Sequence, residues 1–277
     1  MVEYTAAKVK KLRELTGAGI LDSKNALVSA GGDIDKAIEL LRIKGVKDIV
    51  KRSARFTTEG LIAYSRNALI ELNSETDFVA KNKEFQILAN KIVEAVSANK
   101  TSNLDTIKAI SLDGNTIDKL INNLSIKIGE KISLKRAAYL DGNIEVYMHK
   151  RSVNLPPSVG VLVQYINYSP DKSIGRNAAH LIAMQIASLK AKYLKRSDIP
   201  ANIIESETHI AKEFAKKEGK SKQVTSSIIA GHLTNYYKNL VLEDQPLVSD
   251  SKKTVNSLLK ETNIVVSNFV RFEVGLI

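Results

Sequence analysis

The chain has 277 residues, of which 44% are hydrophobic and 26% are charged, a balance typical of a soluble globular protein with two or three modest domains. Cysteine is absent, which excludes a disulfide framework and a zinc site built from thiolates. The formal net charge of +11 permits steering towards nucleic acid, a ribosome or an acidic protein surface without choosing among them, while an aromatic content of 5% without tryptophan disfavours a single-strand binder that stacks bases.

Residues 1 to about 55 predict a small bundle of three short helices followed by a basic linker. Thr5 is a suitable N-cap for the first helix, and the glycines of "TGAG" at 16–19 break the chain after it. Apolar residues recur at helical spacing in each segment: Ala6, Val9, Leu12 and Leu15; Leu21, Ala26, Leu27 and Ala30; Ile34, Ala37, Ile38 and Leu41. The stretch "KGVKDIVKRSAR" at 44–55 is mostly basic and has no long apolar stripe, so it predicts a solvated linker rather than a nucleic-acid contact.

From Gly60 the pattern changes to the alternation of β-strands, in a unit expected to span 56–140. "GLIAYS" and "ALIELNS" are alternating runs separated by Arg66-Asn67, which predicts a tight hairpin. After a helix and a polar helical stretch at 101–126, "EKISLKRAAYL" returns to strand character. The helix carries one apolar face, made of Phe85, Leu88, Ala89, Ile92 and Val96.

The second half of the chain repeats this order of elements, which indicates a related unit at 141–277. Four segments correspond in order: 59–64 with 141–147, 68–72 with 160–166, 88–98 with 181–191, and 134–140 with 268–274. The second copy carries an insertion at about 198–242, where helical spacing predicts two helices joined near "EGKS". We therefore expect an α+β fold of two related antiparallel sheets covered by helices, with a helical hairpin projecting from the second.

Motifs for catalysis, cofactors or metals fail on inspection. "GKS" at 219–221 has Phe214 where a phosphate-binding loop needs glycine, and "GAG" at 17–19 has Asp22 at the third glycine position of a dinucleotide fingerprint. The four histidines show no i,i+4 pairing, so a helical histidine metal site is not expected. The sequence therefore offers no catalytic site that would support an enzyme, and we expect no cofactor. Without a signal-peptide core or a run of about 18 apolar residues, a cytoplasmic location is the default interpretation.

The stretch "SETDFVAK" at 74–81 places an aromatic ring at the expected start of a helix. Phe78 lies one heptad before Phe85 and could extend its buried face, but its i+3 and i+4 neighbours are polar. Phe78 and Val79 thus form a short apolar island, with Asp77 available for capping or for stabilising the helix dipole. The pattern leaves two alternatives open, a packed hydrophobic staple and an exposed anchor for a partner.

The same region resembles a known family. "TDFVAKNKEF" at 76–85 is similar to the signature of elongation factor Ts, the nucleotide-exchange factors of elongation factor Tu. Other segments resemble the family in the expected order: "VKKLRELTGAGILDSKNAL", "GGDIDKAIELLRIKG", "KIGEKI", "VGVLV", "SKKTVNSLL" and "FVRFEVG". The resemblance covers essentially the whole chain, and it implies a ubiquitin-associated-like bundle at 1–55 and a coiled-coil protrusion at the helical hairpin.

The resemblance implies a mechanism without bond chemistry. Members bind elongation factor Tu in its GDP form and push an aspartate–phenylalanine pair, here Asp77 and Phe78, towards the magnesium site, so that GDP leaves and GTP can rebind. The other positions that match family contacts with Tu are Thr76, Val79, Lys24, Ile128, Gly129, His149, Val248 and Ser249. Elongation factor Tu, GDP-bound or nucleotide-free, is thus the expected partner, with no nucleic acid or membrane required.

This chain departs from the family pattern at several places. "KRSVNLPPS" at 150–158 is longer than the connection in some members, which leaves the register around His149 open, and Ser249 replaces an apolar family residue. The C-terminal helix of some members has no counterpart after "FEVGL", and a disulfide-linked dimer is not expected without cysteine. From composition alone, a basic ribosome- or RNA-associated binding protein stays the alternative, although Lys and Glu are intermixed along 211–222 rather than gathered on one charged face.

Overall fold

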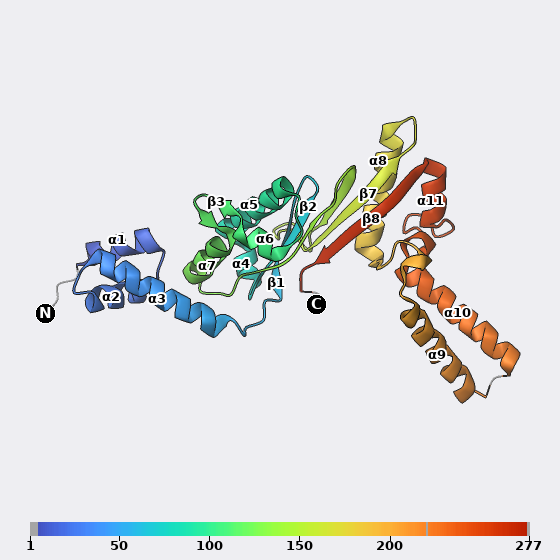
Figure 1. Ribbon diagram of the computed structural model, residues 1–277, viewed down its shortest axis with the longest axis horizontal. Coiled ribbons are helices and arrows are strands. Elements are labelled where there is room, and N and C mark those ends of the chain that lie inside the picture. The colour runs from blue at the N-terminus through green and yellow to red at the C-terminus, as the bar shows by residue number, and fades with distance from the viewer. Residues whose placement is uncertain (1–4, 220, 276–277) are drawn as a thin grey trace. The chain divides into compact units, whose positions relative to one another are not determined.

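The computed structural model describes residues 5–219 and 221–275, and it combines helices with antiparallel sheets (Figure 1). This confirms the predicted α+β class. The fold divides into two compact units. One comprises residues 1–139, 150–158 and 273–277, and the other comprises 140–149 and 159–272. The finer predicted domain boundaries stay a prediction.

Three helices open the first unit: α1 (Ala6–Thr16), α2 (Ile20–Ser29) and α3 (Ile34–Arg52). The side chain of Thr5 accepts a hydrogen bond from the Lys8 amide, which confirms the predicted N-cap of α1. The predicted apolar faces meet in a small core whose fully buried members are Leu12, Leu27 and Ala37. A core of this size supplies little burial, so contacts with the rest of the unit matter for the stability of these helices.

The prediction of a linker at 44–55 is wrong for residues 44–52, because α3 continues through Arg52. No residue in this basic segment strongly breaks a helix, and the segment packs against a part of the chain that is remote in sequence. Gly45 lies against Ile126, so closely that a Cβ at this position would stand 2.7 Å from the Ile126 Cδ1 atom. Farther along, Arg52 donates a hydrogen bond of 3.3 Å to the Ser125 carbonyl oxygen. Contact with a neighbouring helix, which the hydropathy pattern cannot show, therefore orders the end of α3.

This close approach yields a test. Gly45→Ala is expected to destabilise the C-terminal half of α3 by about 1 kcal/mol, because overpacking typically costs about 1–3 kcal/mol and the better helix propensity of alanine returns at most about 1 kcal/mol. Hydrogen exchange of the backbone amides at 44–52 measures the change. Adding Ile126→Val removes the crowded methyl group and should restore protection. Stronger protection in Gly45→Ala alone would contradict the packing that we describe.

The sheet of the first unit has the strand order β1 (Glu59–Ser65), β2 (Ala68–Ser74) and β5 (Ser133–Tyr139), all antiparallel. Ser65 pairs with Ala68, which confirms the tight hairpin at Arg66-Asn67. Helix α5 (Lys83–Asn99) packs on β1 and β2. Its predicted apolar face is buried at all five positions: Phe85, Leu88, Ala89, Ile92 and Val96.

The polar helical stretch predicted at 101–126 is two helices with a small hairpin between them. The chain forms α6 (Leu104–Ala109), strands β3 (Ser111–Leu112) and β4 (Asn115–Thr116), and α7 (Ile117–Ile128). Asp113 and Gly114 both adopt positive φ, 51° and 77°, and turn the chain between the two strands. Helix α7 is amphipathic, because Ile117, Ile121 and Leu124 recur at helical spacing and are buried in the core of the unit.

An ion pair between the buried Glu71 and the half-buried Arg136 crosses β2 and β5. The Glu71 side chain is fully buried, and its Oε2 atom accepts a hydrogen bond of 2.6 Å from Arg136 Nε. The Arg136 guanidinium also donates to the carbonyl oxygen of Glu273, at 3.0 Å, and the Asn73 side chain donates to Glu71 Oε1 at 3.1 Å. A charge at this depth requires such partners, so the pair makes the unit depend on Arg136.

The second unit repeats the sheet order with β6 (Ile144–His149), β7 (Val159–Asn167) and β8 (Ile264–Glu273). Helix α8 (Lys172–Leu189) packs on β6 and β7, and α11 (Val255–Thr262) packs on α8. The core residues of this unit come from these elements and include Val161, Val163, Ile182, Ile186, Val255 and Ile264.

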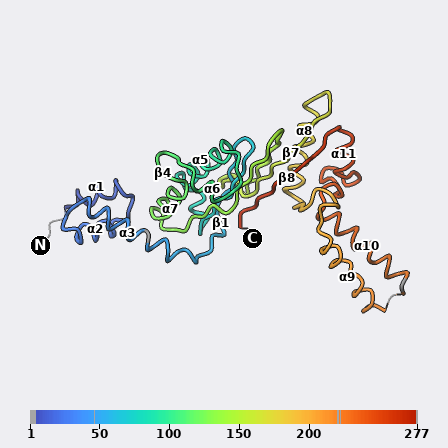
Figure 2. The backbone as a smooth tube through the Cα atoms, in the orientation of Figure 1, coloured from blue at the N-terminus to red at the C-terminus, as the bar shows by residue number. Residues whose placement is uncertain are grey.

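The predicted insertion forms a helical hairpin in which α9 (Ala201–Lys217) and α10 (Lys222–Leu240) lie side by side (Figure 2). Single turns of 3₁₀ helix, η1 (Arg196–Asp198) and η2 (Leu242–Asp244), flank the hairpin. The joint predicted near "EGKS" includes position 220, which lies outside the described residues. Across the ranges 5–219 and 221–275, no helix is both long enough and apolar enough to cross a membrane.

Candidate functional site

The stretch that contains Phe78 forms a separate five-residue helix, α4 (Asp77–Lys81), and not the first turn of α5. Asn82 is extended, with ψ of 130°, and its side chain caps α5 instead. Phe78 is 77% exposed, whereas Val79 is only 4% exposed and Phe85 is fully buried. The packed staple is therefore wrong and Phe78 is exposed, while its role as an anchor for a partner stays a prediction. The kink at Asn82 turns the Phe78 ring away from the buried face of α5.

Asp77 lies in the first turn of α4, while Thr76 is the N-cap and makes no side-chain capping bond. The Lys81 ammonium donates a hydrogen bond of 2.8 Å to Asp77 and lies 5.5 Å from the centre of the Phe78 ring. This hydrogen bond is the main reason why the pKa of Asp77 is lowered from its ordinary value. At neutral pH the helix thus presents a carboxylate and an exposed ring side by side.

Ile128 and Gly129 are brought to this helix by the residue that follows them. Gly129 ends α7 with φ of 88°, a conformation that favours glycine. The Glu130 carboxylate then accepts two hydrogen bonds from Thr76, one from the backbone amide at 3.0 Å and one from the hydroxyl at 2.7 Å. The sequence singled out Thr76, Ile128 and Gly129 but missed Glu130, which connects them.

A second carboxylate also connects the start of α4 with the chain after α7. In this case the segment before α4 supplies the carboxylate and the segment after α7 supplies the amide donor. Glu75 accepts a hydrogen bond of 2.6 Å from the Lys131 amide, and it also pairs with Arg55 at 3.2 Å. The Lys131 ammonium donates to the carbonyl oxygens of Ser53 and Arg55, at 2.6 and 2.9 Å. Three segments far apart in sequence therefore meet at the start of α4. The sequence "KIGEK" contains a signal for the contact made by Glu130, because this carboxylate directly follows a glycine that ends a helix.

Another group of candidate residues meets in the second unit. His149, Val248 and Ser249 line a hollow of about 400 Å³ together with apolar side chains, among which are Leu181, Met184 and Leu247. Val248 is 64% exposed at its rim. The buried Gln185 fixes the segment that carries it, since its side-chain oxygen accepts a hydrogen bond of 2.9 Å from the Val248 amide.

The hollow is suited to an apolar side chain with a polar group at its edge. Tyr147 supplies one wall, and its hydroxyl lies 3.4 Å from His149 Nδ1. His149 is an exposed residue at the end of β6, so its ring remains accessible from outside. The structure thus brings His149 together with the adjacent residues Val248 and Ser249, which lie far from it in the sequence.

Comparison with known proteins identifies the family of this chain. The family model described as Elongation factor TS matches residues 75–276. The chain is 58% identical over 275 residues to Elongation factor Ts of Mycolicibacterium smegmatis, a match that covers 99% of each protein. It is also 58% identical to Elongation factor Ts of Mycolicibacterium vanbaalenii and 54% identical to that of Mycobacterium avium, again over 99% of each protein.

The chain belongs to the elongation factor Ts family. This confirms the resemblance seen in "TDFVAKNKEF" at 76–85, which lies within the matched region. Guanine-nucleotide exchange on elongation factor Tu during translation elongation is the function of this family, and Tu is its partner. Exchange of this kind acts through protein binding.

Lys24, the remaining candidate residue of this elongation factor Ts chain, is exposed on α2. It lines a shallow hollow on the helical bundle with Val9, Arg13 and Ile20, among others, and this hollow contains none of the other candidate residues. The ten candidates therefore form three groups: the α4 segment with the end of α7, the hollow of the second unit, and Lys24 by itself.

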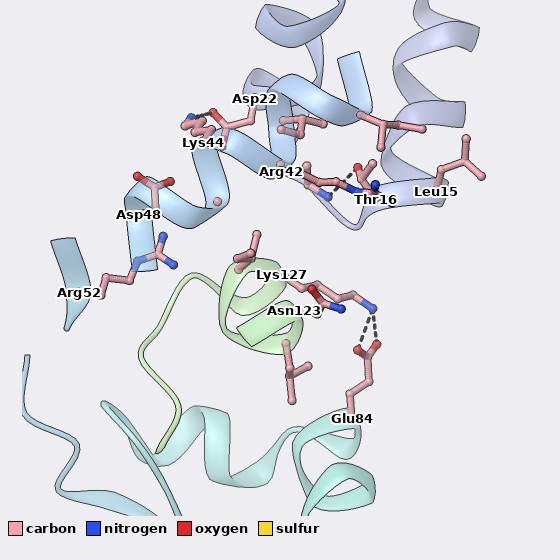
Figure 3. A pocket seen from close by; sticks show the side chains of 17 residues that line it. Leu15, Thr16, Asp22, Arg42, Lys44, Asp48, Arg52, Glu84, Asn123 and Lys127 are labelled. Atoms are coloured by element: carbon pink, nitrogen blue, oxygen red, sulfur yellow. Dashed lines mark hydrogen bonds and ion pairs between the residues drawn. The ribbon is translucent and has the colours of Figure 1, made fainter. Parts of the chain in front are cut away.

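A further cavity has a volume of about 440 Å³. Figure 3 shows the side chains that line it, many of which come from α3 and α7. Its walls carry ion pairs, Lys44 with Asp22 and Lys127 with Glu84, and its floor includes Leu124. None of the ten candidate residues lines it. Within the described ranges of the chain, no group of three or more His, Asp and Glu side chains is placed to hold a metal ion.

Proposed function

We propose that this protein promotes GDP release by pressing Asp77 and Phe78 of α4 against elongation factor Tu, near the site that holds magnesium and phosphate. The observation that carries the proposal is the 77% exposure of Phe78 on a helix whose next residues, Val79 and Ala80, are buried. A large apolar ring that a protein keeps in solvent is a suitable anchor for a partner.

The energy available to the ring is of the right size. Burying a phenylalanine removes about 150–250 Å² from water, which at about 25 cal/mol per Å² amounts to roughly 4–6 kcal/mol before ordering costs. That gross energy can offset part of a metal–phosphate network. The coupling is reciprocal, so GDP weakens the binding of this protein to Tu as much as this protein weakens the binding of GDP. The protein therefore binds GDP-bound and nucleotide-free Tu, and it catalyses no bond change itself.

The hollow lined by His149, Val248 and Ser249 is proposed as a second contact with Tu. Its apolar floor and exposed rim suit one apolar side chain of the partner, with His149 available for a hydrogen bond at the edge. Ser249 contributes a hydroxyl where some family members carry an apolar group, so we propose that most of the contact at this rim comes from Val248. Lys24 and the Ile128-Gly129 pair complete the proposed interface.

Val248→Asp tests this second contact. A carboxylate at the rim would be desolvated on binding without a partner, so the affinity for nucleotide-free Tu should fall at least about tenfold, equivalent to about 1.4 kcal/mol. Isothermal titration calorimetry measures the affinity. Val265→Asp is a matched control, because Val265 is an exposed valine of β8 in the same unit that does not line the hollow. Equal losses in the two variants would contradict a role for the hollow.

We also propose the finer organisation that the family membership supports. The helices of 1–55 form a ubiquitin-associated-like bundle, 56–140 and 141–277 are related core subdomains, and the hairpin at about 198–242 is the coiled-coil protrusion. The equivalent strand orders β1-β2-β5 and β6-β7-β8 support the relation between the subdomains. The protein acts in the cytoplasm, where Tu works, and needs neither nucleic acid nor membrane for exchange.

Release of a fluorescent GDP analogue from Tu of the same organism tests the proposed function. Excess unlabelled GDP traps the emptied Tu, and the release rate is compared with and without a small amount of this protein. Acceleration by substoichiometric protein is the expected result, because each molecule dissociates and acts again. Unchanged release with folded protein would contradict exchange activity, and ribosome and RNA pull-downs would then test the basic-protein alternative.

A further inference from the structure

The helix that carries Phe78 has little means of holding its own geometry. It contains five residues, Asp77–Lys81, far fewer than an isolated helix needs for stability. Its N-cap, Thr76, makes no side-chain capping bond. An exposed ring has no packing of its own, so its position is only as well defined as that of the backbone that carries it. The position of Phe78 therefore depends on groups outside this short helix. Val79 and Ala80 hold one side of the helix through burial, and its N-terminal end needs another restraint.

Glu130 supplies that restraint. Its two carboxylate oxygens act on one residue, with Oε2 at 3.0 Å from the Thr76 amide nitrogen and Oε1 at 2.7 Å from the Thr76 hydroxyl. A bidentate contact of this kind fixes both the position and the rotation of the N-cap residue. Hydrogen bonds to an ionised acceptor are also about twice as strong as neutral ones. The hydroxyl that could have capped α4 is thereby committed to Glu130.

The backbone of Glu130 is itself held. Its carbonyl oxygen accepts a hydrogen bond of 2.5 Å from the hydroxyl of Ser125, a residue that is 5% exposed. The preceding Gly129 amide donates to the Ser125 carbonyl oxygen at 2.9 Å and ends α7. The reciprocal bond from the Lys131 amide to Glu75 prevents the two segments from sliding past each other. Glu130 thus transmits the fixed end of α7 to the start of α4.

We infer that Glu130 is a positioning residue for nucleotide exchange, which holds α4 through Thr76 in the orientation that presents Asp77 and Phe78 to the partner. The inference rests on the proposed role of Phe78 and deepens it. Without Glu130 the start of α4 frays, and the ordering of the helix has to occur during the encounter with Tu, which lowers the exchange rate.

Replacement of Glu130 separates hydrogen bonding from charge. Glu130→Ala should lower kcat/KM of exchange about tenfold, equivalent to about 1.4 kcal/mol, the size expected for losing hydrogen bonds to a charged acceptor. Glu130→Gln should lose only about threefold, because its amide oxygen can accept from the Thr76 amide and its NH₂ group can donate to the Thr76 hydroxyl, although neutral hydrogen bonds are about half as strong. Asp113→Asn is the control, because it removes the charge of a carboxylate elsewhere in the same unit, one that pairs with Lys91, at a position with φ of 51° that asparagine tolerates.

Testing Glu130→Ala in a protein that already lacks the Asp77 and Phe78 side chains distinguishes a positioning role from a general loss of structure. In a protein whose Asp77 and Phe78 are both alanine, Glu130→Ala should lower the residual exchange rate by less than about twofold, since residues that act through one another are not additive. The same tenfold loss in both backgrounds would overturn the inference. So would a Glu130→Gln variant as slow as Glu130→Ala, because charge and not placement would then matter.

Measurement on the free protein does not depend on the proposed function. In Glu130→Ala the amide of Thr76 should lose about tenfold of its protection from hydrogen exchange, and the NMR order parameters of Asp77 and Phe78 should fall from about 0.85 towards 0.6. Unchanged values would overturn the inference even if exchange were slowed. If the wild-type protein failed to release GDP from Tu, the proposed function would fail by itself, while these spectra would still report whether Glu130 orders α4.

Discussion

Phe78→Ala is expected to slow the release of GDP from elongation factor Tu by this protein about 30-fold or more. Truncation of a central apolar anchor typically costs about 2 kcal/mol or more of interface energy, and about 1.4 kcal/mol is a factor of ten. The ring is 77% exposed in the free protein, so its loss leaves no cavity. Stopped-flow fluorescence of a labelled GDP measures the rate, at protein concentrations below and above that of Tu.

Phe56→Ala provides the matched control. Phe56 is a phenylalanine of the same unit that is even more exposed, at 87%, and it belongs to none of the groups assigned to the interface. Its replacement should leave exchange within about twofold of the wild type, since exposed side chains outside an interface contribute little. Both variants should keep the unfolding temperature of the wild type. Full exchange activity in Phe78→Ala would remove the ring from the mechanism.

Arg136→Met is expected to have the largest effect on stability, about 3 kcal/mol in the first unit. Removing one partner of a buried ion pair leaves an uncompensated charge, and measured costs are about 3–5 kcal/mol. The lower end applies because Glu71, although fully buried, keeps the hydrogen bond from Asn73. The carbonyl oxygen of Glu273 would also lose its donor. Hydrogen exchange of the backbone amides of β2 and β5 measures the free energy of unfolding of this unit.

Arg176→Met is a matched control in the second unit. Arg176 also pairs with a glutamate, Glu145, at 3.3 Å, but its side chain is 75% exposed. His180 still contacts the same carboxylate, at 2.9 Å. We expect a cost below about 1 kcal/mol, as for exposed ion pairs in general. If the two arginine variants were equally stable, burial would not explain the importance of Arg136.

Much of the secondary structure could be predicted from the sequence, because local residue patterns determine it. Alternating runs on both sides of Arg66-Asn67 predict the hairpin that pairs Ser65 with Ala68, and the apolar face of α5 is buried as its spacing predicts. The family could also be identified from the stretch that begins at Thr76 together with further segments along the chain. These features depend on residues only a few positions apart, where backbone geometry and side-chain periodicity leave few alternatives.

The tertiary structure alone decided what surrounds these elements. Hydropathy could not separate a buried Phe78 from an exposed one, since the answer depends on the kink at Asn82. The extension of α3 depends on the contact of Gly45 with Ile126, and the placement of α4 depends on the bond between Glu130 and Thr76. The kink at Asn82 is local, but the other two contacts join residues that are remote in sequence. Their partners are brought together only when the sheets and helices pack, so local patterns carry no record of them.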